Sequence, residues 1–239
     1  MTQLKTDNNA IVNSTTQYLK NIYSAIDYKH KIIKPSTNAK LGKKITKGIW
    51  KDKKIYTLTL VERATCTSDC EHWLDCYGNN MPFAHRFKTD NEHGIALMKR
   101  IWGELEQLNS KHKQGFVIRL HVLGDFFSWD YVDFWRKAIE NFDNLFVYGY
   151  TRWHPHTSIG NAVYKVRNKH LSRFKVRFSN LPSDKFSASS SDFKSFKASQ
   201  NKRNNINITC PVQLDKTDSC GTCGLCWTAQ TKPIIFLTH

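Results

Sequence analysis

The chain has 239 residues, of which 40% are hydrophobic, so it can bury a core without disulfides and can form one large domain or two small ones. Lys and Arg outnumber Asp and Glu by 36 to 20, and the resulting net charge of +16 favours a polyanionic partner such as nucleic acid or a nucleotide. The chain has no apolar run of roughly 18 residues and no apolar leader at its start, so we expect a soluble, cytoplasmic protein without a membrane partner.

The N-terminal quarter of the chain is polar and rich in lysine. We expect residues 1–54 to form a basic arm, with a weak helical pattern through Ile11, Tyr18, Ile22 and Ile26. Residues 55–61 (IYTLTLV) alternate and consist mainly of β-formers, which predicts a strand that leads into the first group of cysteines.

Strand and helix patterns alternate between residues 92 and 182. Apolar residues at helical spacing predict a helix from Ile95 to Leu108, and Ser128 is suited to cap a second helix that runs past Ile139. A third helix is expected near residues 157–170, and strands are expected at 116–123, 145–151 and 174–181. This alternation predicts an α/β fold over residues 55–182, either a parallel sheet or a partial β/α barrel.

Four residues with functional side chains come directly after predicted strands: Cys66, Asp125, Arg152 and Asn180. Ligands of such folds gather at the carboxyl ends of the strands. We therefore expect these four residues to lie on one rim of the sheet.

The C-terminal part divides into two segments. Residues 183–205 are rich in serine and lysine, which predicts an exposed insertion. Residues 206–239 hold the second group of cysteines and a final apolar strand, PIIFL.

All seven cysteines fall into two groups, and an odd number of clustered cysteines in a reducing compartment indicates metal ligands more than disulfides. The second group is Cys210 followed by a C-x2-C-x2-C run, Cys220, Cys223 and Cys226. This spacing is closer to bacterial ferredoxins than to zinc ribbons, and Gly221 and Gly224 would let backbone N–H groups turn towards sulfur. A 4Fe–4S cluster is the leading interpretation and zinc is the alternative.

The first group, Cys66, Cys70 and Cys76, offers three thiolates on one loop with C-x3-C-x5-C spacing. Three thiolates can hold a 4Fe–4S cluster by three of its irons and leave the fourth iron open. This layout resembles that of radical S-adenosylmethionine (SAM) enzymes, although their usual spacing is C-x3-C-x2-C. Gly124 and Asp125 stand where that family has its SAM-binding motif, so the resemblance implies that they bind the cofactor.

Two simpler interpretations fit the same residues. Both cysteine groups could share one zinc ion or cluster, completed by His72, His85 or His121. A Gly-Asp pair between a strand and a Ser-capped helix is also ordinary turn chemistry.

Several runs together resemble the phage "gene product 88" family: NAKLGKK, the Cys76-Tyr77 pair, LHVLGDFFSWDYVDFW, FVYGYTR, CPVQ with SCGTCGLCW, and IIFLTH. The resemblance covers most of residues 38–239. It implies a viral protein of the host cytoplasm with iron–sulfur ligands and a radical-SAM-like layout.

The leading functional hypothesis is an iron–sulfur protein with one or two 4Fe–4S clusters that performs SAM-dependent radical chemistry on a nucleotide or nucleic acid. Asp125 would bind the SAM amino group, and Tyr148, Tyr150 and Arg152 would line the substrate side. The alternative is a non-catalytic iron–sulfur or zinc protein that binds nucleic acid or transfers electrons.

Overall fold

Four parallel strands form the centre of an eight-stranded sheet: β3 (Lys54–Thr57), β5 (Phe116–Arg119), β6 (Leu145–Thr151) and β7 (Phe174–Ser179). The computed structural model describes residues 14–181, 183–191, 207–228 and 232–238. The strand order is β2-β3-β5-β6-β7-β8-β10-β9. Only β2 (Lys34–Pro35) runs antiparallel to its neighbour; β8 (Ser187–Ser191), β10 (Ile234–Leu237) and β9 (Ile208–Thr209) continue the parallel pairing.

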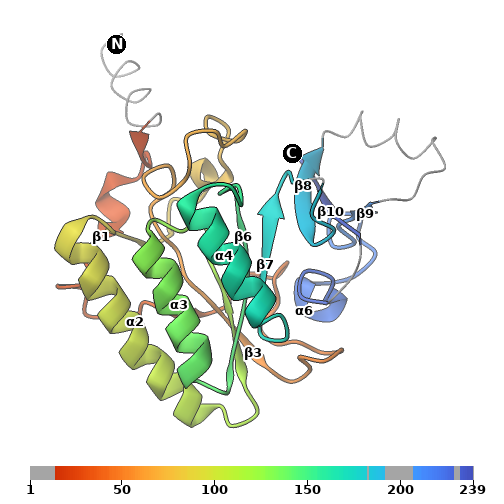
Figure 1. Ribbon diagram of the computed structural model, residues 1–239, viewed down its shortest axis with the longest axis horizontal. Coiled ribbons are helices and arrows are strands. Elements are labelled where there is room, and N and C mark those ends of the chain that lie inside the picture. The colour runs from red at the N-terminus through yellow and green to blue at the C-terminus, as the bar shows by residue number, and fades with distance from the viewer. Residues whose placement is uncertain (1–13, 182, 192–206, 229–231, 239) are drawn as a thin grey trace.

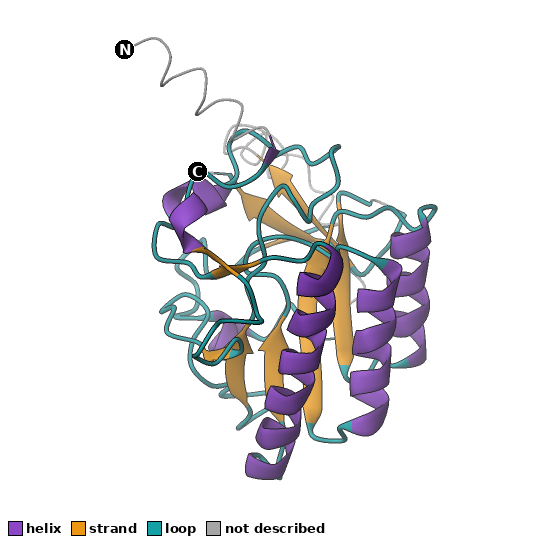
Figure 2. Ribbon diagram, turned by 90° about the vertical axis from the view of Figure 1, so that its left-hand side faces the viewer, coloured by secondary structure: helices purple, strands orange, loops and turns teal. Residues whose placement is uncertain are grey.

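Three long helices cover one face of this sheet: α2 (Asn91–Lys111), α3 (Trp129–Asn141) and α4 (Ser158–Lys169) (Figures 1 and 2). α3 and α4 each follow a central strand and return the chain to the start of the next one, as parallel strands require; α2 does the same between β3 and β5, after the first cysteine loop and β4. A separate two-stranded parallel sheet joins β1 (Ile22–Tyr23) to β4 (Arg86–Phe87).

Side chains alternate between the two faces of the sheet and build two apolar clusters. On β5, Phe116 and Ile118 belong to the cluster under the helices, whereas Val117 belongs to the cluster on the opposite face. The same alternation places Val147 of β6 under the helices and Tyr148 on the opposite face. The period of two along a strand therefore assigns each β5 and β6 residue to one of two separate environments.

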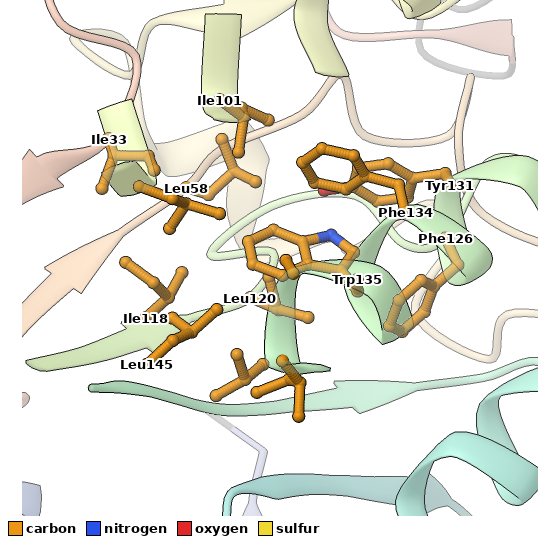
Figure 3. Packing of buried hydrophobic residues seen from close by; sticks show 14 of the residues in the cluster. Ile33, Leu58, Ile101, Ile118, Leu120, Phe126, Tyr131, Phe134, Trp135 and Leu145 are labelled. Carbon is orange, nitrogen blue, oxygen red and sulfur yellow. The ribbon is translucent and has the colours of Figure 1, made fainter. Parts of the chain in front are cut away.

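The helix-side cluster contains large aromatic groups from α3. Figure 3 shows Trp135 among Leu120, Phe126 and Phe134. The Ser128 hydroxyl accepts a hydrogen bond from the backbone N–H of Tyr131 at 3.1 Å, which confirms the predicted cap.

The opposite face is covered by two segments far apart in the sequence. Trp50 stacks on Trp227 with a centroid distance of 5.8 Å, and both side chains are buried. The short helix α6 (Cys220–Cys223) lies along residues 40–46: the N–H of Cys220 donates to Lys40 O at 2.8 Å and that of Gly221 to Leu41 O at 3.0 Å. A Cβ on Gly221 would lie 2.4 Å from Lys44 O, so only glycine allows this approach.

The structure confirms the predicted parallel sheet and all three predicted helices. In the described residues the sheet ends at β2 and β9, which do not pair with each other, so no barrel is seen. The predicted strand 116–123 stops at Arg119 because His121 turns the chain with a φ of +52°.

The N-terminal and Ser/Lys-rich segments differ from their expected character. Tyr18 and Ile22 flank a 3₁₀ turn (Leu19–Asn21) followed by β1, so the predicted helix is wrong there, and Ile11 lies outside the described residues. Within residues 14–54, Ile45 and Trp50 are buried. The segment 183–205 contributes β8, while residues 192–206 lie outside the described part.

Removal of the α3 cap should destabilise the fold. The Ser128→Ala variant leaves the Tyr131 N–H without its acceptor and should lower the free energy of unfolding by about 1 kcal/mol in urea denaturation. Ser110→Ala, at an exposed position in the last turn of α2, is the matched control and should change little. Equal effects of the two variants would contradict the assigned cap.

Candidate metal centres at the carboxyl edge of the sheet

A buried ion pair anchors the loop that carries the first three cysteines. Arg86 donates to both carboxylate oxygens of Glu62, at 2.6 and 2.8 Å, and both side chains are almost fully buried. The same guanidinium donates to the carbonyl oxygens of Gly78, Met81 and Ala84. One arginine therefore holds the start and the end of the loop together.

A second buried arginine holds the middle of this loop. Arg63, in a left-handed conformation with a φ of +66°, donates to Trp73 O at 2.8 Å, to Asn79 Oδ1 at 2.8 Å and to Thr15 O at 3.2 Å. These contacts fix the backbone on either side of Cys70 and Cys76.

The three thiols of this loop are electrostatic neighbours. Burial raises the pKa of Cys66, and the nearby Asp125, Cys70 and Cys76 raise it further. Burial also raises the pKa of Cys70 and of Cys76; the backbone N–H of His72 opposes this for Cys70 and that of Gly78 for Cys76. N–H groups that point at sulfur favour the thiolate, which is the form that binds metal.

Asp125 lies beside Cys66 at the end of the β5 segment. Its carboxylate accepts hydrogen bonds from the backbone N–H groups of Phe126 and Arg152, both at 2.7 Å, and its own N–H donates to Thr65 Oγ1 at 3.1 Å. Burial nevertheless raises the pKa of Asp125 to about 7. Gly124 has a φ of +82°, and a Cβ there would lie 2.4 Å from Thr65 Oγ1, so glycine is required for the β5 end to contact the cysteine loop.

Arg152 and Asn180 reach the cysteine loop from the neighbouring strand ends. The Arg152 guanidinium lies 3.6 Å from the carboxylate of Asp69 and 3.7 Å from that of Glu71, and it is a neighbour of Cys70. Asn180 donates to the Glu71 carboxylate. The expectation that Cys66, Asp125, Arg152 and Asn180 share one rim is therefore confirmed.

The other four cysteines form a second set on the face opposite the helices. Cys210 follows β9, where its N–H donates to Ile235 O at 2.8 Å; Cys220 and Cys223 begin and end α6. Burial raises the pKa of Cys220 to about 12, and the proximity of Cys226, Cys210 and Cys223 contributes. The four thiols are therefore close enough to repel one another when ionised.

Of the two glycines expected to let backbone N–H groups turn towards sulfur, Gly224 does so and Gly221 does not. Gly224 takes the left-handed conformation that ends α6, and the N–H of the next residue, Leu225, opposes the rise in the pKa of Cys223 that burial causes. Gly221 instead directs its N–H to the Leu41 carbonyl, away from sulfur.

Tyr150 belongs to the second cysteine set. Its hydroxyl donates to Cys226 Sγ at 2.9 Å, whereas Asp125 and Arg152 contact the first set. Arg177, buried from β7, donates to the carbonyls of Leu225 and Cys226 and so positions the backbone around the last cysteine. The residues predicted to act with Asp125 are thus divided between the two sets.

Sequence reasoning missed four structural residues of the two sets: Glu62, Arg63, Arg86 and Arg177. The pairing of Glu62 with Arg86 spans 24 residues and has no local signal. The run FKVRFS did contain a signal for Arg177. Its alternating pattern predicts a strand, and an arginine in the middle of a buried strand is unusual enough to indicate a specific partner.

The three candidate histidines have other partners. His72 contacts Ser190 Oγ at 2.9 Å, His85 contacts the Tyr28 hydroxyl at 2.6 Å, and His121 contacts the Tyr131 hydroxyl at 3.3 Å. Burial lowers the pKa of His121 to about 3. Within the described residues, no group of three or more His, Cys, Asp or Glu side chains meets the geometry of a metal site.

The donor chemistry of both sets nevertheless fits a thiolate-bound metal group. Each set gathers thiols that are at least partly buried, N–H groups aimed at sulfur, and arginine charge: Arg63 beside Cys76, and Arg177 beside Cys226. Positive charge next to several thiolates offsets the mutual repulsion that would otherwise keep them protonated.

Loss of the Glu62–Arg86 pair should unfold the cysteine loop. Glu62→Gln leaves a buried guanidinium without its counter-charge, so the free energy of unfolding should fall by about 3–5 kcal/mol in urea denaturation. Asp52→Asn, which breaks the exposed Lys44–Asp52 pair, is the control and should have little effect. A Glu62→Gln variant as stable as the wild type would show that the pair does not anchor the loop.

Comparison with known proteins identifies one family. The family model described as gene product 88 matches residues 30–229, which include both cysteine sets and most of the sheet. Comparisons with curated proteins and with solved structures find no match. None of the helices in the described part of the chain has the length and apolarity of a membrane span. On the extent of the family match, the chain belongs to the gene product 88 family of phage proteins.

Proposed function

We propose that this phage protein binds two iron–sulfur clusters. Cys66, Cys70 and Cys76 would hold one cluster at the carboxyl edge of the sheet. A second, fully ligated cluster would be held by the set on the opposite face: Cys210, Cys220, Cys223 and Cys226. The observation that carries the proposal is that all seven cysteines, spread over 161 residues of sequence, lie in two sets of neighbouring thiols that are buried or partly buried.

The C-x2-C-x2-C spacing favours an iron–sulfur cluster over zinc, and the hydrogen bonds to sulfur suit such a cluster. Cys70, Cys76 and Cys223 each have the backbone N–H of the residue two positions later directed at sulfur. Such N–H groups, together with the Tyr150 hydroxyl on Cys226, tune the reduction potential of a cluster. Zinc has no redox chemistry to tune.

The first set has three thiols, and this number supports a cluster with an open iron. S-adenosylmethionine bound at such an iron supplies radical chemistry. In this proposal Asp125 would accept a hydrogen bond from the amino group of that cofactor, with one of its carboxylate oxygens oriented by the Arg152 N–H. The net charge of +16 supports a nucleotide or nucleic-acid substrate in the host cytoplasm.

Metal analysis tests the two-cluster proposal. Anaerobically prepared wild-type protein should contain about eight iron and eight sulfide ions per chain, four of each per cluster, with a brown colour. Cys70→Ala should lose the first cluster and Cys223→Ala the second, so each variant controls for the other. A colourless protein with stoichiometric zinc would overturn the proposal and leave the zinc alternative.

Reduction in the presence of SAM tests the catalytic part. The cluster-loaded protein should release 5′-deoxyadenosine, and Asp125→Asn should reduce this release at least about tenfold because an amide offers the cofactor's ammonium no charge. Asp133→Asn on α3, on the helix side of the sheet, should release as much as the wild type. If iron-loaded wild-type protein releases none, the protein is a non-catalytic cluster protein, as the alternative of electron transfer or nucleic-acid binding requires.

A further inference from the structure

Arg119 lies between the two cysteine sets. It is the last residue of β5, and its neighbouring ionisable groups include Tyr77, which directly follows Cys76, and Cys220 of the second set. Its register partner on β6 is Tyr148, so the two side chains stand next to each other on the face opposite the helices.

No carboxylate in the described part of the chain neutralises Arg119. Among the ion pairs formed by the described residues, none includes this guanidinium. Tyr77 is a close neighbour of Arg119, and the guanidinium carbon lies 6.0 Å from the Tyr148 ring centroid and 5.6 Å from that of Tyr150. Because a guanidinium carries five N–H donors, Arg119 retains donors for an anion beyond its contact with Tyr77.

The hydroxyl of Tyr148 is a second donor without an acceptor. This side chain is 1% exposed, and its oxygen has no hydrogen-bond partner among the described residues. The neighbouring Tyr150, two residues later on the same strand face, has its hydroxyl satisfied by Cys226. A buried hydroxyl without a partner costs free energy unless a ligand satisfies it.

We propose that Arg119 and the Tyr148 hydroxyl form a binding site for an oxyanion, a phosphate or carboxylate group, of the ligand on which this protein acts. A guanidinium fork binds both groups through paired N–H donors, and the phenol adds a third donor. Arg119 is half-buried and Tyr77 beside it is 52% exposed, so solvent reaches the Arg119 end of the site. The claim that the bound oxyanion belongs to a substrate rests on the proposed function. Oxyanion binding itself requires no metal.

Calorimetric titration with inorganic phosphate and, separately, with acetate tests this site on the full chain at low ionic strength. The wild type should bind phosphate or acetate at one saturable site. The anion that binds with the higher affinity identifies the class, phosphate or carboxylate, that the site prefers. Arg119→Met should weaken binding roughly 10- to 100-fold, the loss expected for charge-assisted hydrogen bonds. Arg136→Met on α3 removes the same charge from the helix side of the molecule and should bind as the wild type does.

Tyr148→Phe separates a ligand site from a structural role. It removes only the hydroxyl, so the free protein should be as stable as the wild type or more stable, while oxyanion affinity should fall about tenfold. If Arg119→Met and Tyr148→Phe bind both anions like the wild type, or if the wild type binds neither, the proposal is overturned. These titrations are done on metal-free and on cluster-loaded protein, so failure of cluster loading does not mimic failure of oxyanion binding.

Discussion

The parallel register of β3, β5, β6 and β7 is the constraint on which both cysteine sets depend. Because these strands run in the same direction, their carboxyl ends meet at one edge of the sheet. The loop with Cys66, the turn with Asp125 and the turn with Arg152 consequently lie together, although 86 residues separate the first from the last. A single antiparallel strand among the four would place one of these groups at the opposite edge.

The alternation of side chains along β5 and β6 separates the site into two chemical environments. Asp125 and the backbone of Arg152 face the loop with three thiols, whereas Tyr148 and Tyr150 face the segment with four. Residues 40–46 and 220–223 close over this second face through backbone hydrogen bonds, so the NAKLGKK run and the last cysteines form one packed unit. Arg119 has neighbours on both sides: Tyr77, which directly follows Cys76, and Cys220 of the second set.

Local signals in the sequence predicted most of the central fold. Helical periodicity, the Ser128 cap and β-rich runs predicted α2, α3, α4, β6 and β10, and the β–α order predicted that strand ends would share a rim. Contacts distant in sequence left no such signal: Ile45 and Trp50 are buried in the cluster that contains Trp227, and β8 is a strand because β7 and β10 flank a run of serines. Tyr150 lies beside Cys226 of the second set rather than beside Asp125, because its side chain is on the face of β6 opposite the helices.

Anomalous X-ray scattering from crystals of the anaerobically prepared protein tests the central claim most directly. The account predicts two peaks at the iron absorption edge in each chain, one beside Cys66, Cys70 and Cys76 and one among the four C-terminal cysteines. A single peak shared by both sets, peaks at the zinc edge only, or no peak beside either set would contradict it.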